Sequence, residues 1–315
     1  MPKHLFTAAL LSGALTLPLY AQTTSVDYFA EMASAAVDFT EGDLDGLLVV
    51  MDDDDTLTQV PCTDASASAT CQYLGGPAWY SWQQDLVNAN STSPYRIAET
   101  SDDLIALSAM LFGMMDMGYT DPAIPDVLGE MAALGAKMLV LTARGGADVS
   151  PTQTQFADQM SADGSTSFAD FIAAHALHDP ASKLPSLASP MVMNTPASCA
   201  TKREVTYSDG VLYGAGQDKG LLLRCLLTRT ESSDITHIVF IDDTLANVTA
   251  VANAFPPGSE GPAALPLYYT RLEAHKAALT TGPDAARLQD IAAARWAAIE
   301  AALLGALLSP IPALE

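Results

Sequence analysis

The sequence predicts an α/β protein with a doubly wound parallel sheet and a mainly helical insertion. Three short apolar segments, at residues 47–51, 137–141 and 237–241, have the unalternated composition of strands buried on both faces of a sheet. Helical patterns separate them, as in a sheet that is covered by helices on both faces. Each strand is followed by Asp or Thr, and such sheets bind ligands at the carboxyl ends of their strands. We therefore expect a functional site at that edge.

Residues 1–21 have the order of a secretory signal: a basic start, an apolar stretch over residues 5–19, and Ala21 before polar residues. We expect cleavage near Ala21 and export to the periplasm or the medium. The apolar stretch is shorter than the roughly 20 residues of a membrane span. It also contains Gly13 and Pro18, so we expect no stable membrane anchor.

The sequence predicts a first helix over residues 25–41, before the first strand. It also predicts an insertion between the first two strands. Segment 58–120 then combines a Ser/Thr/Ala-rich loop, an aromatic patch around Trp79 and helical periodicity over 102–117. A second insertion, at about 146–200, is helix and loop without a strong pattern. Either insertion could be the lid over a substrate.

The second half of the chain predicts a hairpin at 206–213, a helix from Lys219, the third strand and a further helix, and residues 265–269 are a candidate for one more strand. An Ala/Leu-rich helix at 285–308 ends the pattern. The expected parts are a signal peptide (1–21), a core (22–57 and 121–284), a cap insertion (58–120) and a C-terminal helix packed on the core (285–315).

Composition and charge exclude some classes of protein. The chain has 315 residues, 49% of them hydrophobic, which is enough for a large core. Its net charge of −23 would repel a polyanion, so nucleic acid is not an expected partner. The four cysteines, Cys62, Cys71, Cys199 and Cys225, permit two disulfides in an oxidising compartment, with three possible pairings. No cysteine has a histidine at metal-ligand spacing along the chain, which argues against zinc.

The first strand ends in the pattern Asp52-x-Asp54-x-Thr56. A carboxylate held at a strand end can attack phosphorus and form an aspartyl-phosphate. A second carboxylate two residues later can turn toward the same space and protonate the leaving oxygen. We expect Asp52 to be the nucleophile and Asp54 the general acid and base.

The other strand and helix ends supply the groups that phosphoryl transfer requires. Lys219, at a helix start, could place a positive charge beside a phosphate, and the hydroxyl of Thr142 could donate to a phosphate oxygen. Asp242 and Asp243 would complete an oxygen shell for Mg²⁺, which prefers carboxylates, carbonyls and water. Asn247, one helical turn further, could orient these groups by hydrogen bonding. We therefore expect Mg²⁺ as the cofactor.

These segments resemble the four ordered motifs of the haloacid dehalogenase-like superfamily. The segments concerned are residues 50–57, 139–142, Lys219 and residues 241–247. The resemblance implies a Rossmann-like core and Mg²⁺ held by Asp52, the Asp54 carbonyl and Asp242. It also implies phosphate contacts from Thr142 and Lys219. The export signal and residues 74–79 are similar to exported bacterial members of unassigned substrate.

The resulting prediction is an exported, Mg²⁺-dependent phosphatase that acts on a small phosphorylated substrate. Arg144 could bind an anionic part of that substrate, or it could form a surface salt bridge. Trp79 could stack on a leaving group or pack within the cap. Two alternatives use the same residues: a phosphotransferase with an acceptor other than water, and a non-catalytic binding protein of the same fold.

Overall fold

The computed structural model describes residues 24–63, 71–161, 163–191, 193–194 and 197–308. Its main sheet has seven strands in the order β1-β9-β8-β2-β5-β7-β6. All neighbouring strands are parallel except β6 and β7, which form an antiparallel hairpin. The bounds are β1 (Thr24–Val26), β2 (Leu47–Met51), β5 (Lys137–Thr142), β6 (Thr206–Ser208), β7 (Val211–Tyr213), β8 (His237–Asp242) and β9 (Ala263–Tyr269). The predicted α/β fold class, with its mostly parallel sheet and helical insertion, is confirmed.

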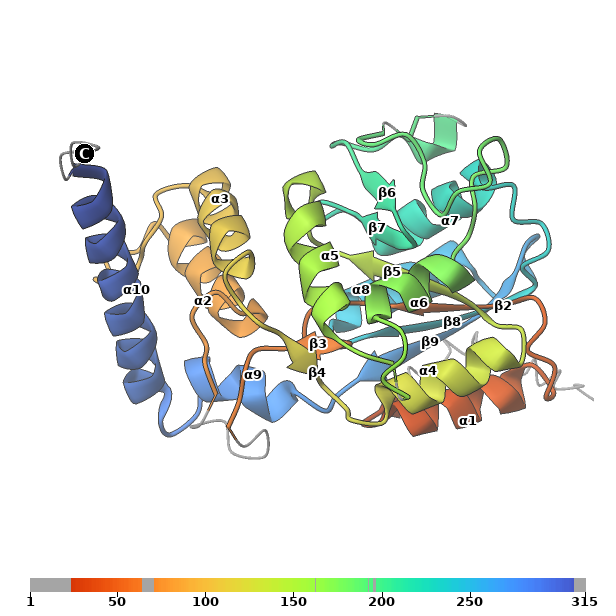
Figure 1. Ribbon diagram of the computed structural model, residues 1–315, viewed down its shortest axis with the longest axis horizontal. Helices are drawn as coiled ribbons and strands as arrows, with labels where there is room; N and C mark the ends of the chain where they lie inside the picture. Colours follow the sequence, from red (N-terminus) through yellow and green to blue (C-terminus); the bar gives the residue numbers. More distant parts are fainter. Residues whose placement is uncertain (1–23, 64–70, 162, 192, 195–196, 309–315) are drawn as a thin grey trace, which may run out of the picture.

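Helices cover both faces of this sheet (Figure 1). Successive strand residues point to opposite faces, so Val49 and Met51 of β2 belong to one apolar cluster and Leu48 and Val50 to the other. The first cluster is closed by α1 (Phe29–Phe39), α4 (Ile124–Ala133), α5 (Val149–Asp158) and α6 (Phe168–His175). The second is closed by α7 (Lys219–Arg229) and α8 (Leu245–Ala254).

The first helix is shorter than the sequence predicts. Residues 24–26 form β1, which pairs with β9 at the sheet edge, and α1 begins only at Phe29. Tyr28 has an extended backbone at the N-cap, and the side chain of Glu31 accepts hydrogen bonds from the backbone N–H groups of Asp27 and Tyr28. These two hydrogen bonds to Glu31 fix the start of the helix, and the residues before it pair as a strand.

The insertion after β2 is helical and has an apolar cluster of its own, and we refer to this insertion as the cap. A two-stranded sheet, β3 (Thr58–Gln59) with β4 (Gly118–Tyr119), brings the chain out and back, and α2 (Pro77–Asn88) and α3 (Ser101–Phe112) lie between them in sequence. The second insertion contributes η2 (Gly146–Asp148), α5, α6 and η3 (Ala197–Cys199). Since Phe156, Phe168 and Ile172 are buried in the main cluster, α5 and α6 are part of the core layers.

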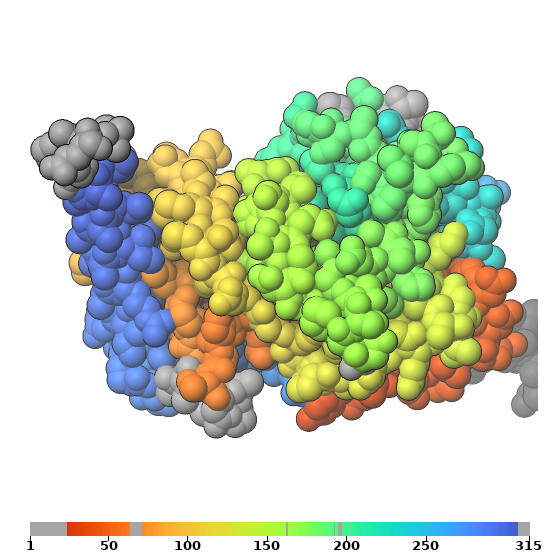
Figure 2. Space-filling view, in the orientation of Figure 1, coloured from red at the N-terminus to blue at the C-terminus, as the bar shows by residue number. Residues whose placement is uncertain are grey.

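The last two helices, α9 (Glu273–Thr280) and α10 (Ala285–Leu308), pack with the cap. The sequence placed the C-terminal helix on the core, whereas its buried residues Leu288 and Ala292 share a cluster with Trp79 and Leu104 of α2 and α3. Figure 2 shows α10 at the end of the molecule, with α2 and α3 between it and the core. Its apolar side is therefore used to extend the small core of the cap.

All four cysteines form disulfides, Cys62 with Cys71 and Cys199 with Cys225. This pairing is one of the three that the sequence permits, and it indicates an oxidising compartment. Within the described part of the chain, none of the helices combines the length and the hydropathy of a membrane span. The predicted signal, residues 1–21, lies outside the described residues.

Candidate functional site

Three neighbouring strands end in the polar residues that the sequence singled out. β2 lies between β5 and β8, and the register pairs Met51 with Ile241, so Asp52 and Asp242 leave the sheet side by side. The backbone N–H of Asp52 donates to the carbonyl of Ile241 at 3.0 Å, which continues the ladder to the sheet edge. Thr142 ends β5 on the other side of β2. Parallel pairing thus gathers residues that are far apart in the chain.

Lys219 joins two of these carboxylates. Its Nζ donates to Oδ1 of Asp52 and, at 2.7 Å, to Oδ2 of Asp242. It is the first residue of α7, and the preceding Asp218 caps the helix by accepting from the N–H of Leu221. Burial lowers the pKa of Lys219, but the nearby carboxylates of Asp242 and Asp52 outweigh burial and raise it above its usual value. Lys219 is therefore a fixed, buried ammonium ion.

Asp242 is held by the start of α8 as well as by Lys219. The amide of Asn247 donates to both carboxylate oxygens of Asp242 at 3.1 Å, and the N–H of Thr244 donates to Oδ1 at 2.8 Å. Asn247 thus has the orienting contact that the sequence predicts for it. Asp242 is fully buried, so its position is set by these partners and leaves little rotational freedom.

Asp243 contacts a residue that sequence reasoning missed. Lys276 of α9 donates from Nζ to Oδ2 of Asp243 at 2.6 Å and to its carbonyl at 3.0 Å. The N–H of Asp243 donates to Oγ1 of Thr56 at 3.1 Å, which ties β8 to the loop after β2. Burial raises the pKa of Asp243 and the charge of Lys276 opposes that rise. No motif surrounds Lys276 in the sequence, so only the fold reveals its role.

The carboxylates of Asp52, Asp242 and Asp243 form a group that could hold a metal ion. One oxygen of each lies within 4.8 Å of the others, and all three residues are buried. Oxygen donors of this kind suit a hard divalent cation such as Mg²⁺. Burial, the largest influence, raises the pKa of Asp52 well above its usual value, Lys219 opposes the rise, and Asp242 and Asp243 add to it. A bound cation would relieve this repulsion.

The loop after β2 is folded tightly around its own carboxylates. The main-chain carbonyl of Asp53 accepts from the N–H groups of Leu57 and Thr58. The side-chain Oδ1 of Asp53 accepts from the Thr58 hydroxyl at 2.8 Å. Asp55 has a φ of 60°, in the left-handed region that favours glycine. It is fully buried and neither of its carboxylate oxygens has a hydrogen-bond partner. A buried carboxylate without hydrogen bonds, in this backbone conformation, lowers the stability of the fold. Residues of this kind are typical of functional loops.

Asp54 and Arg144 form a bidentate ion pair. Nε and Nη2 of Arg144 donate to the two oxygens of Asp54 at 2.9 and 2.6 Å. Nη1 donates to Thr152 and to Gln155, both at 2.8 Å. Arg144 is thus buried beside Asp54 and is not a surface residue. Its proposed contact with an anionic substrate stays a prediction.

Two further predicted residues lie in different surroundings. Thr142 is buried at the end of β5, and its Oγ1 accepts from the N–H of Arg144 at 3.1 Å. Trp79 is buried in the apolar cluster of the cap. The structure therefore brings together Asp52, Asp54, Thr56, Thr142, Lys219, Asp242, Asp243 and Asn247 at the sheet edge, and it places Trp79 in the cap interior.

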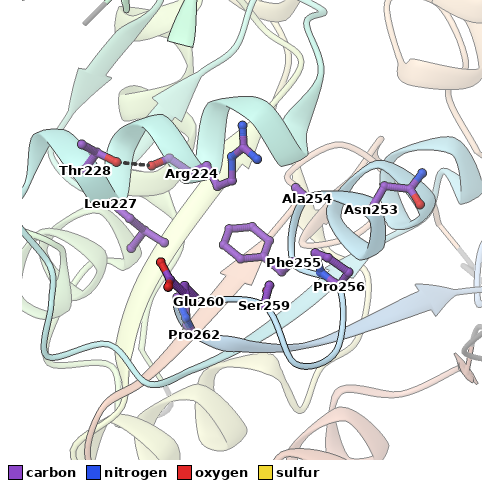
Figure 3. A pocket seen from close by; sticks show the side chains of 10 residues that line it. All are labelled: Arg224, Leu227, Thr228, Asn253, Ala254, Phe255, Pro256, Ser259, Glu260 and Pro262. Carbon is purple, nitrogen blue, oxygen red and sulfur yellow. Dashed lines mark hydrogen bonds between the residues drawn. The ribbon is translucent and has the colours of Figure 1, made fainter. Parts of the chain in front are cut away.

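Two cavities in the described chain lie outside this group. One of about 380 Å³ lies between the second half of α7 and the end of α8, with Arg224 and Phe255 in its wall (Figure 3). A second, of about 250 Å³, lies between α3 and α5 and is lined by Phe112 and Gln155. Gln155 also binds Arg144, so this second cavity adjoins the site through one side chain.

The fold and the site define a class: an α/β protein with a mostly parallel sheet, a helical insertion, and a buried acidic group at the strand ends that could hold a metal ion. The chain belongs to the family described as "Protein of unknown function (DUF2608)", which matches residues 27–306. No curated protein and no solved structure matches the chain. The family match spans the core, the cap and both terminal helices.

Proposed function

We propose that the protein is a Mg²⁺-dependent phosphomonoesterase of the haloacid dehalogenase-like type, acting on a small phosphorylated substrate. The observation that carries this proposal is the contact of one buried ammonium, Lys219, with Asp52 and Asp242 at the ends of adjacent strands. A nucleophile, a counter-charge and a set of metal ligands thereby lie within one hydrogen-bonded group. That is the arrangement phosphoryl transfer needs, because its catalysis is mostly positioning and charge stabilisation.

The ligands proposed for Mg²⁺ are the side chains of Asp52 and Asp242 and the main-chain carbonyl of Asp54. Asp243 is a further oxygen donor in the same group. When bound, Mg²⁺ would stabilise the negative charge on the phosphoryl oxygens. Asn247 and the N–H of Thr244 keep Asp242 oriented for this role. A hydrogen-bonded second layer of this kind supports metal binding in proteins.

Asp52 acts as the nucleophile in this proposal. One of its oxygens attacks phosphorus, the bond to the leaving oxygen breaks, and water later hydrolyses the aspartyl-phosphate. An attacking carboxylate must be ionised, and burial opposes ionisation of Asp52. The ammonium of Lys219 favours the ionised form, which is the physical reason for placing it there.

Lys219 and Thr142 are the proposed phosphate contacts. Lys219 supplies a fixed positive charge, and a hydroxyl that accepts from a backbone N–H still has its own proton to donate. Asp54 is the proposed acid and base. It must leave Arg144 to protonate the leaving oxygen, and its side chain, 18% exposed, is the most accessible of the carboxylates in these ion pairs at the site.

The test uses residues 22–315 and a generic aryl phosphate, with and without Mg²⁺. We expect turnover that EDTA abolishes and Mg²⁺ restores. Asp52→Asn should lower the rate at least about 1,000-fold, because the covalent route is closed. The matched control is Asp38→Asn, an exposed residue of α1, which should keep full activity. An acid-quenched, hydroxylamine-sensitive phosphoprotein should form with wild type and not with Asp52→Asn.

The same preparation separates the two alternatives. If an added alcohol captures the phosphoryl group in preference to water, the protein is a phosphotransferase. If Mg²⁺ binds but no phosphoester in a broad panel turns over, the non-catalytic reading replaces the proposal. Full activity of Asp52→Asn would show that the nucleophile is assigned wrongly.

A further inference from the structure

A second group of metal-ligating side chains lies at the base of the cap, apart from the carboxylates. Ligand atoms of Cys62, Cys71 and His275 all lie within 4.8 Å of one another. Cys71 and His275 are buried, and Cys62 is half-buried and so open to solvent on one side. Within the described residues this is the only such group that contains sulfur. The sequence shows no sign of it, because His275 lies 204 positions after Cys71.

His275 is held in place by Tyr73, two residues after Cys71. The ring of Tyr73 stacks on the His275 ring with centroids 4.7 Å apart and planes 15° apart. The Tyr73 hydroxyl donates to the carbonyl of His275 at 3.0 Å and also contacts Nδ1 at 3.4 Å. Burial lowers the pKa of His275 to about 4, so its imidazole is neutral at physiological pH. Neutral imidazole is the form that binds metals.

We propose that reduction of the Cys62–Cys71 disulfide turns this group into a Zn²⁺ site formed by two thiolates and the imidazole of His275. Zinc favours sulfur and nitrogen ligands, and sites with three protein ligands take water as the fourth. This inference stands on residues outside the carboxylate site and does not depend on the proposed phosphatase activity.

The chemistry balances with an external reductant. Two molecules of a thiol reductant cleave the S–S bond, give the protein two thiols and leave as their own disulfide. Zn²⁺ then displaces one proton from each thiol and binds both thiolates. The disulfide and the zinc site are thus alternative states of the same sulfur atoms, and the redox state of the surroundings selects between them.

The other disulfide provides a contrast inside the same chain. Cys199 and Cys225 are both buried, and in the described part of the chain no histidine or carboxylate groups with them. That pair is enclosed by the second apolar cluster. We therefore expect zinc binding to follow the Cys62–Cys71 pair alone.

The experiment measures zinc affinity by competition with a chromophoric chelator, using protein reduced with a phosphine. Millimolar Mg²⁺ and the Asp242→Asn background keep zinc from the carboxylates. We expect one Zn²⁺ per reduced chain and none per oxidised chain. His275→Ala should weaken binding at least about 100-fold, and His178→Ala, which replaces an exposed histidine, should not change it. Cys62→Ser with Cys71→Ser should abolish it.

Cobalt offers a readout that does not depend on affinity. Co²⁺ added to the reduced protein should give thiolate-to-metal charge-transfer absorption, which disappears in the double cysteine variant. Circular dichroism confirms that each variant is folded, and His275→Gln replaces His275→Ala if the latter is not. Zinc binding that survives loss of His275, or of both Cys62 and Cys71, would overturn the proposal. So would reduced protein that binds no zinc and gives no cobalt absorption.

Discussion

Replacing Arg144 by methionine removes a buried guanidinium that holds two carboxylates of the loop after β2. Arg144 donates to both oxygens of Asp54 at 2.6 and 2.9 Å, and its Nη1 lies 3.2 Å from Oδ2 of the fully buried Asp53. Methionine keeps most of the length and apolar volume of the side chain. The substitution therefore tests the charge and its hydrogen bonds.

The magnitude follows from what the substitution leaves behind. Removing one partner of a buried ion pair costs about 3–5 kcal/mol, because the remaining charge is buried without compensation. Most of this loss of stability should come from Asp53, because Asp53 is fully buried whereas the carboxylate of Asp54 can still contact solvent. We expect the free energy of unfolding of Arg144→Met to fall by about 3–5 kcal/mol at pH 8 in EDTA. Urea denaturation followed by two spectroscopic probes measures it and checks for two-state behaviour.

The loss should depend on pH in a definite direction. Burial raises the pKa of Asp53 to about 6, and the charge of Arg144 opposes that rise. The pair contributes stability only while Asp53 is ionised, so its contribution is largest well above pH 6 and declines as pH falls through that value. The difference between variant and wild type should therefore be smaller at pH 5 than at pH 8.

The control is an exposed ion pair in the same protein. Arg287 lies 3.4 Å from Asp284, and the two side chains are 50% and 60% exposed. Arg287→Met should change the free energy of unfolding by less than about 0.5 kcal/mol. Equal losses in the two variants would refute the reasoning, because burial would then have no effect on the strength of the Arg144 contacts.

Three further predictions concern packing, cross-linking and pH. Gly220→Ala should cost about 1–3 kcal/mol in urea denaturation, because the new Cβ would lie 2.3 Å from the carbonyl oxygen of Ala250. Cys199→Ser with Cys225→Ser opens a link with a sequence separation of 26 residues and should lower the free energy of thermal unfolding by about 3.5 kcal/mol. The pKa of His275 is about 4 in the folded protein against 6.5 normally, so the free energy of unfolding should fall by up to about 3 kcal/mol as pH falls from 6.5 to 4. His275→Gln should remove that dependence on pH.

The strand ends are the part of the site that the sequence could predict. Residues of β2 and β8 are apolar without alternation, which identifies central strands, and the carboxylates that follow must then meet at one edge. Lys219 could be placed because it opens a helix before β8. Each inference depends only on local pattern and on the rule that parallel strands end together.

Residues that act through long-range contacts could not be predicted in the same way. Lys276 reaches Asp243 from a helix beyond the last strand, and no spacing links the two. Arg144 was recognised as a cation near the site, but its partner Asp54 is chosen by side-chain direction, which a sequence pattern does not contain. His275 meets Cys71 only because α9 packs against the cap.

Charge balance supplies the strongest physical reason to expect a cation at the strand ends. Six carboxyl groups meet there: Asp52, Asp53, Asp54, Asp55, Asp242 and Asp243. In the described structure, the cations that form ion pairs within this group are three: Lys219, Arg144 and Lys276. Burial, followed by repulsion from Asp243, raises the pKa of Asp55 well above its usual value, so a proton can neutralise that group. With Asp55 neutral and the other five carboxylates ionised, two negative charges are in excess among these groups. One divalent ion would balance them, and the Asp52, Asp242 and Asp243 oxygens are the donors grouped to receive it.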